Sequence, residues 1–119
     1  MLFRSFQADV ADPAALHGLF EQATQALGPL AGLVNNAGSS GRFARTDEQD
    51  AAELTRLFAT NVIATILACK EAVKRLSARH GGSGGAIVNL SSVAARTGGL
   101  PGLVTYSASK GAIDRKSVV

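Results

Sequence analysis

The stretch AIVNLSSVAARTGGLPGLVTYSASKGA, residues 86–112, decides the fold of this chain. It begins with an apolar strand, predicted over residues 86–90, and reaches Ser92 just past the carboxyl end of that strand. A loop rich in Gly and Pro follows, and then Tyr106 and Lys110 appear four residues apart. A helix over this last segment would place the phenol and the ammonium on one face, with their Cβ atoms about 5–6 Å apart.

These three side chains suggest acid–base chemistry. A hydroxyl at the carboxyl end of a strand lies where open α/β sheets bind their ligands. A phenol is a poor acid–base group at neutral pH, and a nearby cation favours its phenolate form. We therefore predict that Tyr106 acts as a general acid/base assisted by Lys110, and that Ser92 donates a hydrogen bond to a reacting oxygen.

The two halves of this stretch together carry a family resemblance. SSV at residues 91–93, followed by YSASK at residues 106–110, resembles the catalytic stretch of the classical short-chain dehydrogenase/reductase family. That family moves hydride between NAD(P) and a carbonyl or secondary alcohol. Because Tyr-x-x-x-Lys alone occurs in many helices by chance, the weight of the resemblance depends on the rest of the chain.

Length and composition fit one small domain. The chain has 119 residues, of which 46% are apolar and 18% are charged, so we expect a single partial NAD(P)-binding domain over residues 1–119. The net charge of +3 is mild and the basic residues are scattered. The densest basic group ends a predicted helix, where cations complement the helix dipole, and we expect no nucleic-acid partner.

Cysteine usage and hydropathy indicate the compartment. Cys69 is the single cysteine, so it cannot form an internal disulfide, and we expect a reducing, cytoplasmic location. No continuous apolar run reaches the roughly 18 residues that would span a bilayer, and we expect no membrane partner. The opening residues MLFRSFQ lack the long apolar segment of a signal peptide.

The first part of the chain reads as strand, helix, strand. A short strand is predicted over residues 4–8. Asp12 before Pro13 is a typical helix start, and Gly28 with the following Pro ends the apolar stripe of that helix. His17 lies off the stripe and is expected at the surface. The next strand is predicted over residues 31–34, apolar on both faces as parallel strands are.

That second strand runs directly into the motif NNAG at residues 35–38. Small and amide residues suit a strand end where the backbone approaches a flat ligand closely. The motif serves equally well to stabilise the sheet, and the residues leave both readings open. The resemblance implies that Asn36, Ala37 and Gly38 border the adenosine ribose of the cofactor.

The longest helix is predicted over residues 47–79, with Asn61 inside a wide apolar stripe. A buried amide must find partners or cost about 1–3 kcal/mol. Asn61 is therefore either a satisfied core asparagine or, as the resemblance implies, the asparagine of a catalytic tetrad that holds a kinked backbone and a relay water. The stripe itself consists of Leu54, Leu57, Phe58, Val62, Ile66, Cys69, Val73 and Leu76.

Rival motifs fail on context. Residues 81–85 satisfy G-x-S-x-G, but here a helix precedes and a strand follows, and both histidines come before the serine. Residues 107–110 satisfy S-x-x-K, yet no SDN or KTG triplet completes such a site. No cluster has metal-ligand spacing and no Walker motif is present, so we expect no metal site.

The resemblance also assigns roles. It implies that Tyr106 transfers the proton, that Lys110 holds the nicotinamide ribose, and that Ser92 binds the substrate oxygen. Asp9, with the Val10 backbone, would meet the adenine. The cofactor would be NAD or NADP, the substrate a small alcohol or ketone, and the complete protein a homo-oligomer.

The predicted fold class is α/β, a partial Rossmann-like doubly wound parallel sheet, as a three-layer α/β/α fragment. Family members open with a strand and a glycine-rich TGxxxGxG turn, and nothing of that kind precedes Asp9. After Asp114 the residues RKSVV depart from the amphipathic continuation that the resemblance implies, so we expect truncation at both ends. In the order 3-2-1-4-5-6, the three predicted strands correspond to 3, 4 and 5. Strand 4–8 then either moves beside strand 31–34 or stays unpaired.

Both arrangements would expose apolar edges, so we expect marginal stability and an inactive isolated chain. The alternative to an enzyme is a non-catalytic fragment that only associates through its long helix.

Overall fold

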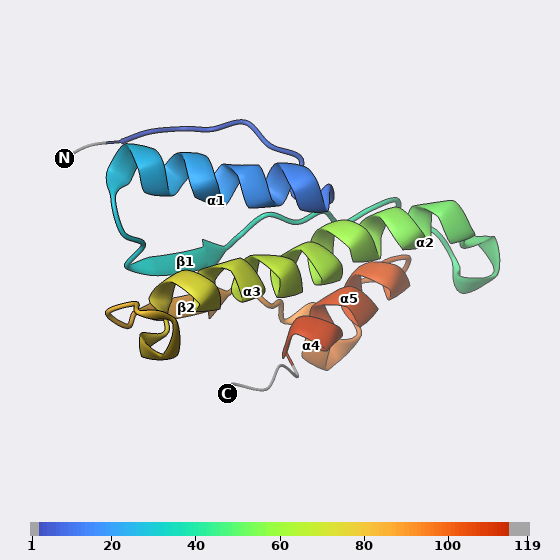
Figure 1. The fold of residues 1–119 in the computed structure, drawn as a ribbon. Helices are drawn as coiled ribbons and strands as arrows, with labels where there is room; N and C mark the ends of the chain where they lie inside the picture. Colours follow the sequence, from blue (N-terminus) through green and yellow to red (C-terminus); the bar gives the residue numbers. More distant parts are fainter. Residues whose placement is uncertain (1–2, 115–119) are drawn as a thin grey trace.

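The computed structural model describes residues 3–114 (Figure 1). Helices alternate with two strands along the chain, and the strands form a small parallel sheet, which confirms the α/β class. The elements are α1 (Pro13–Leu27), β1 (Gly32–Asn35), the 3₁₀ turn η1 (Thr46–Glu48), α2 (Ala51–Phe58), the π-helical segment η2 (Ala59–Ile63), α3 (Ala64–Leu76), the 3₁₀ turn η3 (Ala78–His80), β2 (Ala86–Asn89), α4 (Ala94–Thr97) and α5 (Val104–Asp114).

Helix α1 begins and ends where the sequence predicts. The Asp12 carboxylate accepts from the backbone N–H groups of Ala14 and Ala15, and Pro13 occupies the first helical position, where its missing N–H costs nothing. Gly28 ends the helix with φ of 86°, a positive value that favours glycine.

The sheet has two parallel strands among the described residues. β1 pairs with β2 in a register that runs from Gly32 opposite Ala86 to Asn35 opposite Asn89. Helix α3 contacts both strands, and α1 packs on α3 on the same side (Figure 1). The described chain therefore builds two layers of the expected three.

Because side chains alternate along a strand, the two faces of the sheet differ. Leu33 and Ile87 pack against the core, which is formed by Leu16, Phe20, Ala68, Ala72 and Leu76. Val34 and Val88 point to the other face, where they are 64% and 51% exposed. This apolar face is left without cover by residues 3–114.

The predicted strand over residues 4–8 is not formed: the described part of that segment has no ladder partner. Of the two outcomes considered, the unpaired one is the outcome seen. A strand is stabilised by its neighbours, and β1 and β2 pair only with each other.

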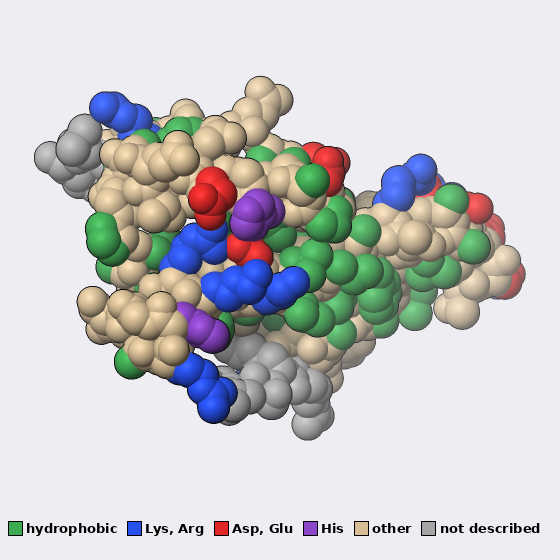
Figure 2. Space-filling model, in the orientation of Figure 1, with side chains coloured by type: hydrophobic (Ala, Val, Ile, Leu, Met, Phe, Trp, Pro, Cys, Tyr) green, Lys and Arg blue, Asp and Glu red, His purple; other side chains and the backbone are tan. Residues whose placement is uncertain are grey.

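The helix predicted over residues 47–79 runs from Ala51 to Leu76 without interruption, but its geometry changes along the way, from α2 through the π-helical segment η2 to α3. The helix does not bury the whole predicted stripe either, since Ile66 and Val73 are 60% and 46% exposed. Its buried face consists instead mainly of small residues, Ala64, Ala68 and Ala72, which let α1 and the sheet approach closely. Figure 2 shows a patch of hydrophobic side chains on the visible face of the molecule, beside a group of charged ones.

By length and composition alone, the continuous helical stretch Ala51–Leu76, 26 residues, could cross a membrane. The core helix of a globular protein meets the same two criteria, so this is weak support for a membrane role.

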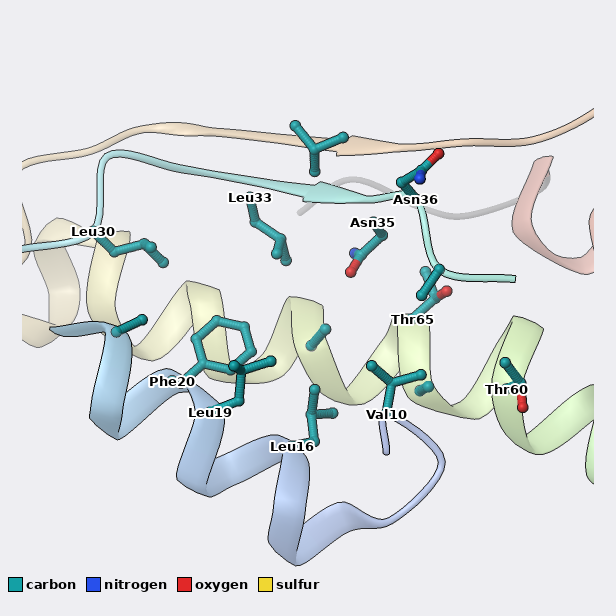
Figure 3. Close-up of a pocket in the computed structure, with 15 residues that line it drawn as sticks. Val10, Leu16, Leu19, Phe20, Leu30, Leu33, Asn35, Asn36, Thr60 and Thr65 are labelled. Atoms are coloured by element: carbon teal, nitrogen blue, oxygen red, sulfur yellow. The ribbon is translucent and has the colours of Figure 1, made fainter. Parts of the chain in front are cut away.

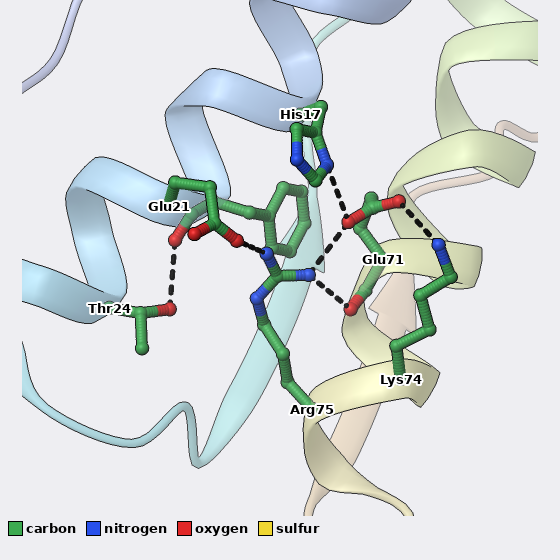
Figure 4. Close-up of polar contacts among 7 residues, drawn as sticks. His17, Glu21, Thr24, Glu71, Lys74 and Arg75 are labelled. Carbon is green, nitrogen blue, oxygen red and sulfur yellow. Dashed lines mark hydrogen bonds and ion pairs between the residues drawn. The ribbon is translucent and has the colours of Figure 1, made fainter. Parts of the chain in front are cut away.

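A cluster of charged side chains joins α1 to α3 (Figure 4). The Glu71 side chain is only 9% exposed, and its oxygens lie 2.7 Å from Arg75 Nη1, 3.1 Å from His17 Nδ1 and 3.2 Å from Lys74 Nζ. Arg75 also pairs with Glu21 of α1. The Arg75 hydrogen bond, with smaller contributions from His17 and Lys74, outweighs desolvation and lowers the pKa of Glu71 to about 2.

Candidate functional site

Helix α5 carries both Tyr106 and Lys110. The helix begins at Val104, as predicted, so Tyr106 and Lys110 lie one turn apart on it. Lys110 Nζ lies 5.9 Å from the centroid of the Tyr106 ring. The expected juxtaposition of ammonium and phenol is therefore present.

Lys110 is a buried cation, 7% exposed. Its Nζ donates to the Leu90 carbonyl, just past the end of β2, at 2.8 Å. Among residues 3–114 no carboxylate forms an ion pair with it. An ammonium has three N–H donors, so this one retains capacity for further acceptors, and a buried charge without a counter-charge is costly unless acceptors surround it.

Asn61 lies inside the π-helical segment η2 and is 1% exposed. Its Nδ2 donates to the Ser39 carbonyl at 2.8 Å and to Ser109 Oγ at 3.0 Å, and its Oδ1 accepts from the Ser39 N–H at 2.9 Å. The side chain is thus a satisfied amide, and the backbone that carries it departs from α-helical geometry. Single-turn π segments are frequent at functional sites.

Gly38 fits tightly between these groups. A Cβ at this position would lie 3.3 Å from Asn61 Oδ1 and 3.6 Å from Lys110 Nζ. Three segments that are far apart in the sequence, the end of NNAG, η2 and α5, therefore meet at one point. A side chain at this position would require the Asn61 amide to shift by a few tenths of an ångström.

Ser92 follows the carboxyl end of β2, two residues beyond the Leu90 carbonyl that holds Lys110. Its Oγ accepts from the Ala94 N–H at 3.2 Å, so the hydroxyl hydrogen is free to be donated elsewhere. The neighbouring Ser91 donates to the Lys110 carbonyl at 3.3 Å, which ties this loop to α5.

A separate cavity of about 240 Å³ lies between α1, α3 and β1 (Figure 3). Val10, Asn36 and Ala37 are among its lining residues, so the structure brings these three predicted cofactor contacts together. Most other lining side chains are apolar. Asp9 is exposed, and its carboxylate accepts from the Ala11 N–H at 2.9 Å.

Asn35, the first residue of NNAG, has a structural role. Its Nδ2 donates to Asn89 Oδ1 on the paired strand at 2.7 Å, and Cys69 Sγ of α3 lies 3.5 Å from the same nitrogen. Cys69 is half-buried there, which agrees with its expected place on the apolar side of the helix. Of the two readings of the motif, sheet stabilisation therefore holds for Asn35.

Sequence reasoning missed Ser109, which is one of the letters of YSASK and of the rejected S-x-x-K pattern but was given no role in either. Its one sequence signal is its position between Tyr106 and Lys110. In the structure its hydroxyl meets the Asn61 side chain. The structure thus groups Gly38, Asn61 and Lys110 around one point, with Tyr106 a turn away. Residues 3–114 contain no cluster of three or more His, Cys, Asp or Glu side chains that could hold a metal ion.

Comparison with known proteins identifies the family to which the chain is similar. The family model for short chain dehydrogenase matches residues 2–116. The oxidoreductase YgfF of Escherichia coli, itself uncharacterized, is 47% identical over 108 residues, 91% of this chain and 44% of that protein. 2-(S)-hydroxypropyl-CoM dehydrogenase 3 of Xanthobacter autotrophicus is 43% identical over 110 residues, 92% of this chain and 41% of that protein.

Solved structures agree in fold. NADH-dependent reductase A1-R′, complexed with NAD, superposes with a TM-score of 0.82 at 29% identity, covering 91% of this chain and 46% of that one. A short-chain dehydrogenase/reductase from Serratia marcescens gives 0.78 at 37% identity, covering 91% and 47%. The chain spans less than half the length of these relatives, and the partial Rossmann-like fold is confirmed. The chain belongs to the short-chain dehydrogenase family.

Proposed function

We propose that this chain carries the catalytic segment of an NAD(P)-dependent oxidoreductase that interconverts a secondary alcohol and a carbonyl compound. The observation that carries the proposal is the buried Lys110 ammonium, which has no carboxylate partner among the described residues and lies beside Tyr106, Asn61 and Gly38. A positive charge held in this way is suited to polar groups of a bound molecule. Relatives named as NAD-bound and NADP-bound proteins support a nicotinamide cofactor.

The residues present fit such a cofactor. Lys110 retains N–H donors for ribose hydroxyls, and the absence of a side chain at Gly38 leaves the backbone open to close approach. Asn36, Ala37 and Val10 would border the adenosine side, with Asp9 at the adenine. A bound nicotinamide would supply or accept the hydride.

The proton would be handled by this chain. Tyr106 would give its phenolic proton to the substrate oxygen during reduction and accept one during oxidation. Ser92 would orient the same oxygen through its free hydroxyl hydrogen, and Lys110 would favour the phenolate by its charge. Asn61 would hold the η2 backbone, where a relay water could bind.

Tyr106→Phe tests this assignment. The chain can replace the matching segment of 2-(S)-hydroxypropyl-CoM dehydrogenase 3, and turnover can be followed by the absorbance of the reduced nicotinamide. We expect Tyr106→Phe to abolish turnover and to leave cofactor affinity within about twofold, since it removes only the proton donor. Turnover retained by Tyr106→Phe would refute the role. Ser107→Ala on the same helix is the matched control.

A second candidate function is association without catalysis. Ile63, Ile66 and Val73 leave an apolar face of the long helix exposed, and a relative 43% identical over 106 residues is named an inactive dehydrogenase. Titration of the chain with NADH, alongside sedimentation at several concentrations, separates the two. Cofactor binding that Lys110→Met removes would favour the enzyme, and self-association without binding would favour the alternative.

A further inference from the structure

Asn61 and Ser109 are the largest side chains that lie fully buried within residues 3–114, and both are polar. They contact each other directly. In a fully buried place an apolar residue avoids the cost of desolvation, so a buried polar pair is maintained only where every donor and acceptor is matched.

The Ser109 hydroxyl is matched on both sides. It donates to the Tyr106 carbonyl at 2.7 Å and accepts from Asn61 Nδ2 at 3.0 Å. Asn61 in turn is bonded to both backbone groups of Ser39. A continuous line of hydrogen bonds therefore runs from the loop after NNAG, through η2, to the first turn of α5.

This line of hydrogen bonds ends at the backbone carbonyl of Tyr106. Replacing the Ser109 hydroxyl would leave one amide hydrogen of Asn61 without its acceptor and would free the first turn of α5 from η2. Tyr106 and Lys110 are carried by that helix, so its rotation and position determine where the phenol and the ammonium lie relative to Gly38.

We propose that Ser109 is a positioning residue of the proton-transfer site, acting through the Asn61 amide and the Tyr106 carbonyl. The proposal rests on the proposed function of Tyr106. The hydroxyl does not touch substrate or cofactor: it holds α5 against η2.

The first test uses the chain itself and nuclear magnetic resonance. Tyr106 is the only tyrosine of the sequence, so its ring signals are identified without ambiguity. We expect Ser109→Ala to shift these signals and to speed exchange of the Asn61 side-chain amide by about tenfold or more, since that amide loses its acceptor. Ser107→Ala is the matched control, because its Oγ donates to the Gly98 carbonyl at 2.7 Å on the same helix.

Should Ser109→Ala fail to fold, Ser109→Cys replaces the hydroxyl with a larger and weaker hydrogen-bonding group and is read in the same way. Unchanged Tyr106 and Asn61 signals in the folded variant would overturn the proposal. Equal shifts in Ser107→Ala would overturn it as well, since that change leaves the Asn61 contact intact.

The second test measures turnover in the hybrid with 2-(S)-hydroxypropyl-CoM dehydrogenase 3. We expect Ser109→Ala to lower kcat by about tenfold or more through misplacement of the reacting groups, with the KM for cofactor within about twofold. A loss no larger than that of Ser107→Ala would count against positioning. A hybrid without any turnover would contradict the proposed function, and the resonance experiment alone would then decide the role of Ser109.

Discussion

Glu71→Gln should destabilise the chain at neutral pH. The carboxylate is bonded by Arg75, His17 and Lys74 and is nearly buried, and its pKa falls from an ordinary 4.5 to about 2. At about 1.36 kcal/mol per pH unit, this corresponds to an upper bound of about 3 kcal/mol. The His17 and Lys74 side chains are 58% and 50% exposed. Solvent screening therefore reduces the expected loss to about 1–2 kcal/mol.

The pH dependence follows from the direction of the shift. A carboxyl whose folded pKa is depressed stabilises the fold fully above its unfolded value, and this contribution is lost as pH falls through the folded value. The stability gap between the natural chain and Glu71→Gln should therefore be constant above about pH 5, narrow below pH 4.5, and close near pH 2.

Urea unfolding followed by far-ultraviolet circular dichroism measures this gap. A loss of about 1–2 kcal/mol moves the midpoint by about 1 M for a chain of this size. Glu53→Gln is the matched control: its pair with Arg42 is exposed on both sides, so we expect a change below about 0.5 kcal/mol. Equal stability of Glu71→Gln and the natural chain at pH 7, or a gap that persists unchanged at pH 3, would refute the reasoning.

Three further outcomes can be checked by circular dichroism, the first two during urea unfolding and the third during heating. Gly82→Ala should cost about 1–3 kcal/mol or prevent folding, because its Cβ would lie 2.4 Å from the Arg75 carbonyl oxygen; wild-type stability would contradict this. Gly18→Ala should stabilise by about 0.5–1 kcal/mol, because Gly18 lies within α1 with nothing near its Cβ position, and a loss would contradict it. With Val34 and Val88 exposed, the chain should not show a reversible two-state thermal transition above about 45 °C.

Local signals in the sequence predicted local structure well. The Asp12 cap with Pro13 fixed the start of α1, and the spacing of Tyr106 and Lys110 on a helix is confirmed. These features depend on residues a few positions apart, whose geometry the backbone determines. The family, and with it the fold, followed from several such motifs in order.

Other features depend on partners that local pattern does not reveal. The strand over residues 4–8 failed because no neighbouring strand receives it in the described chain. Ile66 and Val73 were expected inside, yet periodicity identifies an apolar face without telling what covers it. The sequence does not single out Glu71, because the groups that compensate its buried charge lie on two helices, α1 and α3. The roles of Ser92, Asp9 and the other site residues stay predictions.

The π segment η2 carries one further consequence. An α-helix turns about 100° per residue, and a π-helical turn contains more residues than an α-helical one. The η2 segment therefore rotates the side chains of α3 relative to those of α2. With that rotation α2 contacts α5 while α3 contacts α1 and the sheet. Deleting a single residue between 59 and 63 would restore a regular helix and turn one half away from its partners. The geometry of this short segment therefore decides whether α2 can contact α5 while α3 contacts α1 and the sheet.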